Sequence, residues 1–334
     1  MTPDAPRLLL ERYGRDLQPI GVLQPLGGFG GLSGSRLWRY PSAAGERLIR
    51  AWPAATKGRG RVETIHGWLR KAADLPFVPQ PFPALDGRTV QELQGAFWEA
   101  TPWLSGAADP IRPPRVERVR AAFQAIGAFH ARLSGGAVDG PSPGLRLRGD
   151  ELRGLLHGGF DAVEAVLSVQ ADDPCLPPSL EWLRLARRTT PAAIQVIEEA
   201  ARLVSPLQPC LRDARPEHFL FEGDRVTGLV DFGAMDVETV AADLARLSGE
   251  WLPLPESKAL RLEAIKAYSD VMPLHPNHPS IESAFEAAAD VLIGERWTRW
   301  RFLERRRFDD PDAFADGIAR GLERLRKLTV RLGA

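Results

Sequence analysis

The pattern of apolar and polar positions divides the chain into an N-terminal part rich in short extended segments and a longer part with helical periodicity. In the first part, residues 61–73 carry Val62, Ile65 and Leu69 at helical spacing with charges between them, which predicts one helix. Gln94-Gly95 joins the last two extended segments and is typical of a hairpin turn. We therefore expect the order strand, strand, helix, strand, strand, with strands at 37–40, 47–52, 88–93 and 96–101.

Beyond Pro102 the periodicity becomes helical. A core helix is predicted over 116–133, and further helices are predicted at 181–204, 258–272, 281–307 and 311–332. A compact strand-rich block at 208–233 interrupts them. The segment 135–149 is dense in glycine and proline, and we expect a loop there. The pattern predicts an α+β chain with a small β-rich lobe, residues 1–102, and a large helical lobe, residues 103–334.

Composition and charge exclude several classes of function. The chain has 334 residues, with 43 Lys plus Arg and 43 Asp plus Glu, so no global basic field attracts nucleic acid. Cys175 and Cys210 are too few for a disulfide framework and lack the paired spacing of a zinc site. We expect two buried thiols and a reducing, cytoplasmic location, with no nucleic-acid partner.

The N-terminus is expected to form an amphipathic helix, because Asp4, Arg7 and Glu11 surround a short leucine run. It lacks the basic and long apolar regions of a signal peptide. No apolar stretch approaches the roughly 20 residues needed to cross a bilayer, so we expect no membrane span.

The strongest chemical signal is a pair of acidic segments joined by a hairpin. Asp213 precedes His218, the strands 219–221 and 226–230 can pair across a turn at Gly223, and Asp231 follows. His218 and Asp231 should therefore lie close together. Phosphoryl transfer needs such a set, with one carboxylate to accept the proton of the attacking hydroxyl and others to hold magnesium on the phosphates.

These segments resemble the aminoglycoside phosphotransferase and choline kinase family, which has a two-lobed protein-kinase-like fold. Leu211-Arg212-Asp213 stands where the family has His-Gly-Asp, and Asp231-Phe232-Gly233 is its metal-binding triplet. The resemblance spans roughly residues 20 to 250 and includes Asp243, which we expect to be structural. It implies that Asp213 is the catalytic base, that Arg215 neutralises the moving phosphate, and that Asp231 binds Mg²⁺.

The chain departs from the family pattern at three positions. Leu211 replaces a histidine and Arg212 a glycine, and both changes leave the role of Asp213 intact. His218 stands where the family has a metal-binding asparagine. Magnesium prefers oxygen ligands, so the imidazole indicates a weaker magnesium site, a water-mediated contact or a site that takes Mn²⁺.

In the first lobe, a glycine-rich run at residues 27–35 precedes the strand at 37–40, as a phosphate-covering loop should. The resemblance implies nucleotide contacts from Arg50, which occupies the position of the family's phosphate-contacting lysine or arginine, and from residues of the run: Gly30, Gly31, Ser33, Gly34 and Ser35. On the helix at 61–73, Glu63 is the expected partner of Arg50, with His66 as the alternative.

The segment 98–106 resembles the hinge that binds adenine through its backbone. Pro102 has no amide hydrogen, so Thr101, Trp103 and Leu104 are the backbone candidates. The segment 296–307 is rich in arginine, which does not suit a polycationic acceptor such as an aminoglycoside. The sequence does not distinguish an anionic acceptor from a neutral one.

Two functions follow from the sequence, beside a third reading as a helical scaffold that binds no nucleotide. The first is a small-molecule kinase that moves the γ-phosphate of ATP or GTP onto a hydroxyl of an unknown acceptor, with Mg²⁺ or Mn²⁺. The alternative is a pseudokinase that binds nucleotide or a partner without turnover. The substitution at His218 and the lack of the usual phosphate-binding lysine motivate this alternative.

Overall fold

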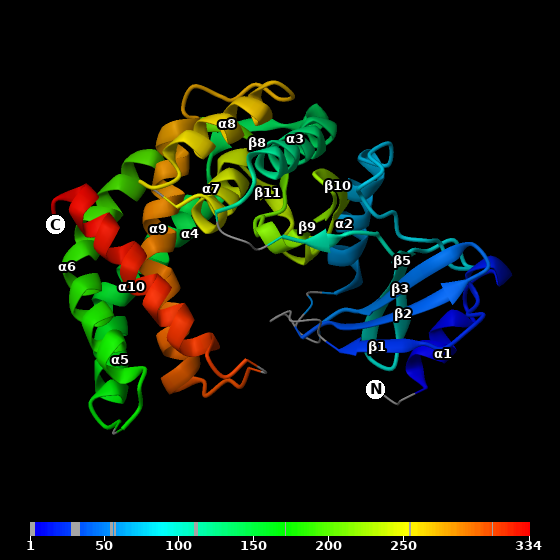
Figure 1. Ribbon diagram of the computed structural model, residues 1–334, viewed down its shortest axis with the longest axis horizontal. Coiled ribbons are helices and arrows are strands. Elements are labelled where there is room, and N and C mark those ends of the chain that lie inside the picture. The colour runs from blue at the N-terminus through cyan, green and yellow to red at the C-terminus, as the bar shows by residue number, and fades with distance from the viewer. Residues whose placement is uncertain are drawn as a thin grey trace. The chain divides into compact units, whose positions relative to one another are not determined.

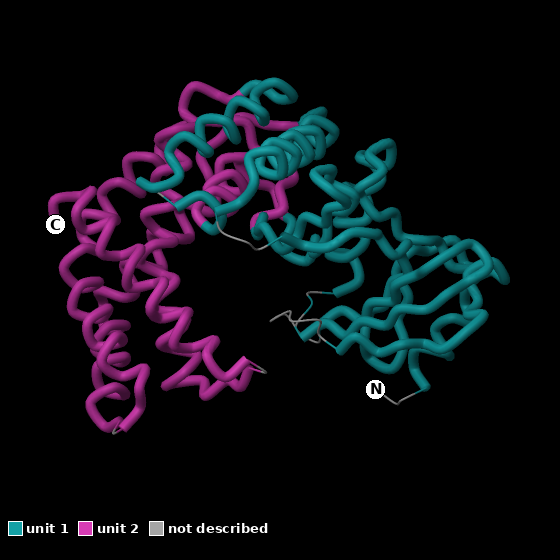
Figure 2. Tube along the Cα trace, in the orientation of Figure 1, with its two compact units in different colours: residues 1–136, 213–235, 250–273 teal, residues 137–212, 236–249, 274–334 magenta. Residues whose placement is uncertain are grey.

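The computed structural model describes residues 4–27, 34–53, 56, 58–109, 113–170, 172–253, 255–308 and 310–334. The chain forms two compact units (Figure 2). Unit 1 comprises residues 1–136, 213–235 and 250–273, and unit 2 comprises residues 137–212, 236–249 and 274–334. The change from strands to helices at residue 102 falls inside unit 1, so it does not coincide with the division between the compact units.

Unit 1 begins with an antiparallel sheet of strand order β1-β2-β3-β5-β4 (Figure 1). The strands are β1 (Gln24–Gly27), β2 (Arg36–Ser42), β3 (Gly45–Ala51), β4 (Gln91–Leu93) and β5 (Ala96–Pro102). Between β3 and β4 lies α2 (Arg59–Lys71), which buries Val62, Ile65, His66 and Leu69 on one face. The order of the four expected strands and the helix is confirmed, but β1 precedes them as a strand that was not predicted, and β4 begins at Gln91 and not at residue 88.

The core of this sheet is closed by the N-terminal helix α1 (Ala5–Leu10). Leu9 and Leu10 of α1 pack with Tyr40, Ile49 and Trp98 of the sheet, all of them almost fully buried. The short turn η1 (Arg15–Leu17) follows α1. Burial of apolar surface of this kind is the dominant favourable term in folding, and it fixes β3 and β5 as central strands.

The rest of unit 1 is built around α3 (Val116–Leu133), whose bounds match the sequence expectation. It packs against α8 (Lys258–Ser269) (Figure 1). Buried between them, His130 Nδ1 lies 2.9 Å from the Tyr268 hydroxyl. A short sheet of order β10-β9-β6 completes the unit, with β6 (Ala107–Ala108), β9 (Phe219–Glu222) and β10 (Arg225–Leu229).

Unit 2 is mainly helical. Its long helices are α4 (Pro143–Gly154), α5 (Phe160–Leu167), α6 (Leu176–Ala200), α9 (His278–Thr298) and α10 (Ala313–Leu332). Glycines allow α9 and α10 to approach closely, because a Cβ atom added at Gly321 would lie 2.8 Å from the Cα atom of Gly294. Among the described residues, no helix is long and apolar enough to cross a membrane.

The expectation of a loop at residues 135–149 is wrong. The segment contains β7 (Val138–Pro141) and the first half of α4. Ser142 caps α4 by accepting the Leu145 N–H, and Pro143 follows as the first helical residue, both of which are helix-start signals. The glycine and proline content obscured these signals in the sequence.

A second short sheet, of order β11-β8-β7, contains the strand that precedes the loop with Asp213. It contains β8 (Val204–Cys210) and β11 (Asp236–Glu238) and leads to α7 (Val240–Trp251). The fully buried carboxylate of Asp243 on α7 accepts the backbone N–H groups of Leu211, at 2.7 Å, and Arg212, at 2.6 Å. This anchors the loop that follows β8 and agrees with the structural role expected for Asp243.

We predict that Asp243→Ala destabilises the protein strongly, because it leaves two N–H groups without an acceptor, at a cost of about 1–3 kcal/mol each. Asp150→Ala on α4 is the control, since its side chain is 70% exposed and its surface ion pair with Arg153 should contribute less than about 1 kcal/mol. Denaturant unfolding measures both. Equal unfolding midpoints for the two variants would contradict the anchoring role.

Candidate active site

The hairpin of β9 and β10 brings two candidate metal-binding residues together. The two strands pair as the sequence predicted, and in the structure Phe219 is opposite Leu229 and Phe221 opposite Val226. The backbone N–H of Val230 donates to the carbonyl of His218 at 3.0 Å. As a result, Nε2 of His218 lies 3.8 Å from Oδ2 of Asp231.

Two residues of the site have left-handed backbone conformations that L-residues adopt rarely. Asp231 has φ of 61° and Arg212 has φ of 62°. Aspartate tolerates this region better than most residues do, whereas arginine needs support from its surroundings. For Arg212 this support is the hydrogen bond from its own N–H to Asp243. Strained conformations of this kind are frequent at functional sites.

The loop between β8 and β9 carries the candidate base and its cation. The Asp213 side chain is half-buried. Arg215 lies two residues further on, and its Nε atom is 3.5 Å from Oε2 of Glu217. That nitrogen is buried and has no hydrogen-bond partner among the described residues. The chain therefore presents a carboxylate and a guanidinium two residues apart.

Arg50 on β3 connects the sheet to the hairpin within unit 1. Its Nη2 atom lies 3.4 Å from Oδ1 of Asp231, and its Nε and Nη2 atoms donate to the Ser35 hydroxyl at 3.2 and 3.1 Å. Its guanidinium also stacks on Trp52, 4.3 Å from the ring centroid. The ion-pair partner of Arg50 in the structure is thus Asp231, and the expected partner Glu63 is exposed on α2.

The inward-facing polar residue of α2 is His66, which contacts a buried glutamate that sequence reasoning missed. Nε2 of His66 lies 2.5 Å from Oε2 of Glu99, and Nδ1 lies 2.7 Å from the Thr89 hydroxyl. Glu99 on β5 is the register partner of Arg50 on β3. The available signal was a single carboxylate inside the otherwise apolar segment 96–100.

Glu99 keeps its charge in this buried position. Burial raises the pKa of Glu99. The hydrogen bond and the attraction from His66, together with the attraction from Arg50, lower this pKa by a larger amount, so the net pKa lies below the usual glutamate range. The sheet therefore holds a buried carboxylate between two basic side chains.

The glycine-rich run is only partly described. Gly30, Gly31 and Ser33 lie outside the described residues, while Gly34 has φ of 77° and Ser35 contacts Arg50. A left-handed φ at Gly34 is favourable only for residues without a Cβ atom. The chain therefore turns at Gly34 before it enters β2.

The expected hinge is the end of β5 and the residues after it. Thr101 pairs with Leu48 of β3 and is buried, and Leu104 is half-buried. The N–H of Trp103 donates to the carbonyl of Glu46 at 3.1 Å. In this conformation Trp103 therefore has no amide hydrogen left for a nucleotide, contrary to expectation.

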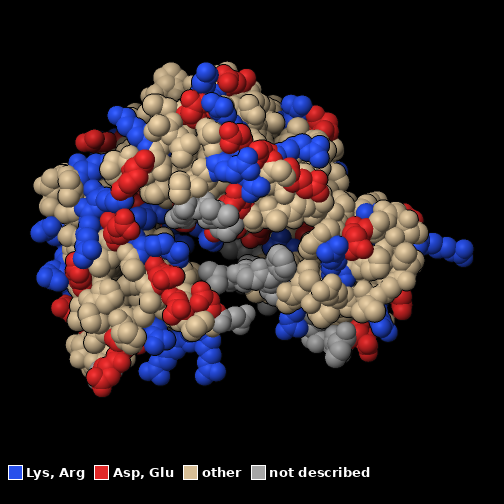
Figure 3. Space-filling model, in the orientation of Figure 1, with Lys and Arg blue, Asp and Glu red and all other residues tan. Residues whose placement is uncertain are grey.

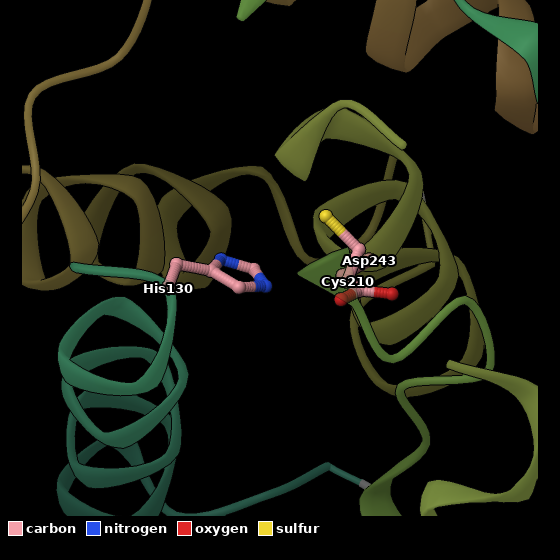
Figure 4. Close-up of side chains that lie close together, drawn as sticks. All are labelled: His130, Cys210 and Asp243. Atoms are coloured by element: carbon pink, nitrogen blue, oxygen red, sulfur yellow. The ribbon is translucent and has the colours of Figure 1, made fainter. Parts of the chain in front are cut away.

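Both cysteines are buried free thiols, as the sequence predicted. Figure 4 shows Cys210 at the end of β8 and Asp243 on α7; the Cys210 sulfur and an Asp243 carboxylate oxygen lie within 4.8 Å of each other. Burial, then the carboxylates of Asp243 and Glu238, raise the pKa of the Cys210 thiol well above its usual value. A protonated thiol is a poor metal ligand and nucleophile, so Cys210 serves packing.

Charged residues of both signs are interspersed over the face seen in Figure 3, as the equal totals of acidic and basic residues lead one to expect. Three of the six arginines of the segment 296–307 form ion pairs: Arg299 contacts Glu295, Arg301 contacts Asp173 and Arg306 contacts Glu304.

The fold is that of known small-molecule kinases. An aminoglycoside phosphotransferase from Alicyclobacillus acidocaldarius superposes with a TM-score of 0.66 at 15% identity, covering 99% of this chain and 96% of its own. A spectinomycin phosphotransferase solved with ADP and spectinomycin gives 0.66 at 11% identity, covering 96% of each chain. A microcompartment-associated aminopropanol kinase gives 0.67 at 13% identity, covering 98% and 97%.

No curated protein sequence matches the chain. The model of the phosphotransferase enzyme family, in contrast, matches residues 26–281, which include strands β2 to β5, the hairpin and α7. Because this match covers most of the chain and the solved kinases share its fold, the chain belongs to the phosphotransferase enzyme family.

Proposed function

We propose that the chain transfers the γ-phosphate of ATP or GTP to a hydroxyl group of a small molecule. The observation that carries the proposal is the meeting of His218, Asp231 and Arg50 at the end of the hairpin, with Nε2 and Nη2 atoms 3.8 and 3.4 Å from the two Asp231 oxygens. Family membership supports the same chemistry. Solved relatives that act on spectinomycin and aminopropanol support a small-molecule acceptor.

In this mechanism Asp213 orients the acceptor hydroxyl and accepts its proton. The hydroxyl oxygen forms a bond to the γ-phosphorus while the bond from that phosphorus to the β,γ-bridging oxygen breaks, and the nucleoside diphosphate leaves. Arg215 neutralises charge on the moving phosphoryl group. Its Nε atom lies 3.5 Å from Glu217 and has no hydrogen-bond partner among the described residues, so the guanidinium keeps donors for such a contact.

Arg50 contacts the nucleotide phosphates in this proposal. Ser35 and the ring of Trp52 hold its guanidinium in place. Glu99 balances its charge from the neighbouring strand, and His66 fixes Glu99 in turn. A planar guanidinium can grip a phosphate through two parallel hydrogen bonds, which a lysine cannot do. Gly34 and the run before it would cover the phosphates, while Thr101 and Leu104 would offer backbone groups to the base.

The residues present fit a divalent ion. Asp231 offers carboxylate oxygens, and Nε2 of His218 lies 3.8 Å from one of them. When bound, Mg²⁺ or Mn²⁺ supplies positive charge to the phosphates. A set with one imidazole nitrogen suits Mn²⁺ better than Mg²⁺. Two buried free thiols also fit the reducing cytoplasm that we propose as the location.

Nucleotide binding without turnover is the second candidate. One specific observation favours it, since Arg50 lies 3.4 Å from Oδ1 of Asp231 and competes with a metal ion for that oxygen. Nucleotide binding by the parent protein without phosphate transfer to any acceptor of a broad hydroxylated panel would favour this candidate.

We predict that Asp231→Asn reduces the ATP affinity measured with Mg²⁺ to the value measured with a chelator, because the variant loses the charge that holds the ion. Asp224→Asn, at the turn of the same hairpin and paired with Arg115, is the matched control and should keep the full effect of the metal. Isothermal titration calorimetry measures both. Undiminished metal-dependent affinity in Asp231→Asn would remove the metal assignment.

We predict that Asp213→Asn leaves the nucleotide dissociation constant nearly unchanged but lowers the transfer rate by about 10²-fold or more, the scale expected for a positioned base. Single-turnover transfer and nucleotide titration separate the two effects. A variant that lost nucleotide affinity and kept its turnover would show that Asp213 is structural.

We predict that the parent enzyme is more active with Mn²⁺ than with Mg²⁺, and that His218→Asn shifts the preference toward Mg²⁺, because an amide oxygen is a harder ligand than an imidazole nitrogen. Initial rates at saturating nucleotide with each ion test this. The histidine has no role at the metal if both ions serve the parent equally and His218→Ala costs nothing.

A further inference from the structure

Arg50 lies between two carboxylates of unit 1. Its Nη2 atom is 3.4 Å from Oδ1 of Asp231, and Glu99 is its register partner on the neighbouring strand β5. Register partners of an antiparallel pair point to the same face of a sheet, with Cβ atoms about 4.5–5.5 Å apart. The guanidinium therefore has one carboxylate beside it on the sheet and a second one at the end of the hairpin.

The two carboxylates differ in their exposure to solvent. The side chain of Glu99 is 10% exposed, whereas that of Asp231 is 40% exposed. Opposite charges attract one another more strongly where water is excluded, and exposed ion pairs contribute little. At comparable separation, Glu99 is therefore the stronger partner of the Arg50 guanidinium.

Glu99 is itself held in place by α2. Nε2 of His66 lies 2.5 Å from Oε2 of Glu99, and the fully buried ring of His66 is fixed in turn by the Thr89 hydroxyl, 2.7 Å from Nδ1. Burial raises the pKa of Glu99, but the hydrogen bond and attraction from His66 and the attraction from Arg50 outweigh this effect. The carboxylate is therefore charged, and its charge is coupled to both basic side chains.

The contact between Arg50 and Asp231 opposes metal binding, because a guanidinium and a divalent ion require the same carboxylate oxygen. When the ion takes Asp231, Arg50 loses this partner. The Arg50 side chain is only 12% exposed, and a charge in such a position is stable only with a counter-charge beside it. Ser35 and the ring of Trp52, which also contact Arg50, carry no charge, so Glu99 supplies the counter-charge.

We propose that Glu99 is a positioning residue that keeps Arg50 on the sheet when Asp231 binds a divalent ion, with His66 holding Glu99 in place. This role rests on the proposed function, because it concerns the same nucleotide and metal site. Glu99 contacts neither the phosphates nor the ion and acts only through Arg50. Without the Glu99 charge, Arg50 is drawn onto Asp231 and blocks the ion.

The first experiment measures how strongly a metal ion assists nucleotide binding by the full chain. A non-hydrolysable ATP analogue is titrated by calorimetry with saturating Mn²⁺ and, separately, with EDTA. The metal ratio is the dissociation constant with EDTA divided by that with Mn²⁺. It is compared among the parent, Glu99→Gln, Arg50→Gln and the variant with both changes. Glutamine has nearly the size of glutamate and still accepts a hydrogen bond, so Glu99→Gln removes mainly the charge.

Tyr268→Phe is the matched control. It also removes a buried polar contact of unit 1, at 2.9 Å to Nδ1 of His130, but Tyr268 lies on α8 and not on the sheet. This variant should keep the metal ratio of the parent. Thermal unfolding verifies that each variant is folded. If Glu99→Gln does not fold, Glu99→Leu takes its place, because an apolar residue often replaces a buried charge without loss of stability.

We expect Glu99→Gln to lower the metal ratio about fivefold or more, the lower end of coupling between two sites. In the Arg50→Gln background the same change should lower the ratio far less, because no guanidinium is left to capture Asp231. General loss of structure and direct repulsion between Glu99 and the phosphates act in both backgrounds, so the comparison cancels them. The positioning role is overturned if the ratio does not change, or if it falls equally with and without Arg50.

The second experiment measures initial transfer rates against Mn²⁺ concentration at saturating nucleotide. Because Arg50 competes with the ion in Glu99→Gln, this variant should need about fivefold more Mn²⁺ or higher for its half-maximal rate. Its rate should approach that of the parent when Mn²⁺ is raised further. A low rate that added Mn²⁺ does not raise also overturns the positioning role.

The proposed function and the role of Glu99 fail separately. A parent with metal-assisted nucleotide binding but no transfer to any acceptor counts against the proposed function, and the calorimetric comparison still decides the role of Glu99. A parent that transfers phosphate while Glu99→Gln keeps its metal ratio overturns that role alone. A parent that binds no nucleotide, with or without Mn²⁺, overturns both.

Discussion

The buried carboxylate of Asp243 is the interaction on which the candidate catalytic loop depends. It accepts the N–H groups of Leu211 and Arg212 at the point where the chain leaves β8. Without it, Arg212 would have little reason to hold a left-handed backbone, and the direction of Asp213, the next residue, would be undefined. A buried helix residue thus fixes the backbone immediately before the residue proposed to do chemistry.

In unit 1, Arg50 pairs with Asp231 and not with Glu63, the partner expected from the sequence. Arg50 is held by Ser35 and Asp231, and the helix α2 contributes His66, whose partner is Glu99 on β5. Charges in such positions are tolerated only when they are paired and hydrogen-bonded. The pairing orders β3, β5 and α2 as one block, and it brings the cation within 3.4 Å of the residue that follows the hairpin.

In unit 2, one buried glutamate sets the start of a helix. The oxygens of Glu238 accept hydrogen bonds from Ser142, Gly144 and Thr239 at the point where α4 begins. Ser142 in turn accepts the N–H of Leu145 and caps the helix. A buried carboxylate far away in the sequence therefore determines where α4 starts.

The sequence by itself determined the elements whose signals are local. The order of α2 and strands β2 to β5, the bounds of α3 and the hairpin of β9 and β10 all follow from periodicity and turn residues, as does the proximity of His218 to Asp231. Only the tertiary structure decided the start of α4, the partner of Arg50 and the buried Glu99. Each of these depends on side chains tens to hundreds of residues apart, whose desolvation and mutual charge exist only after the chain has packed.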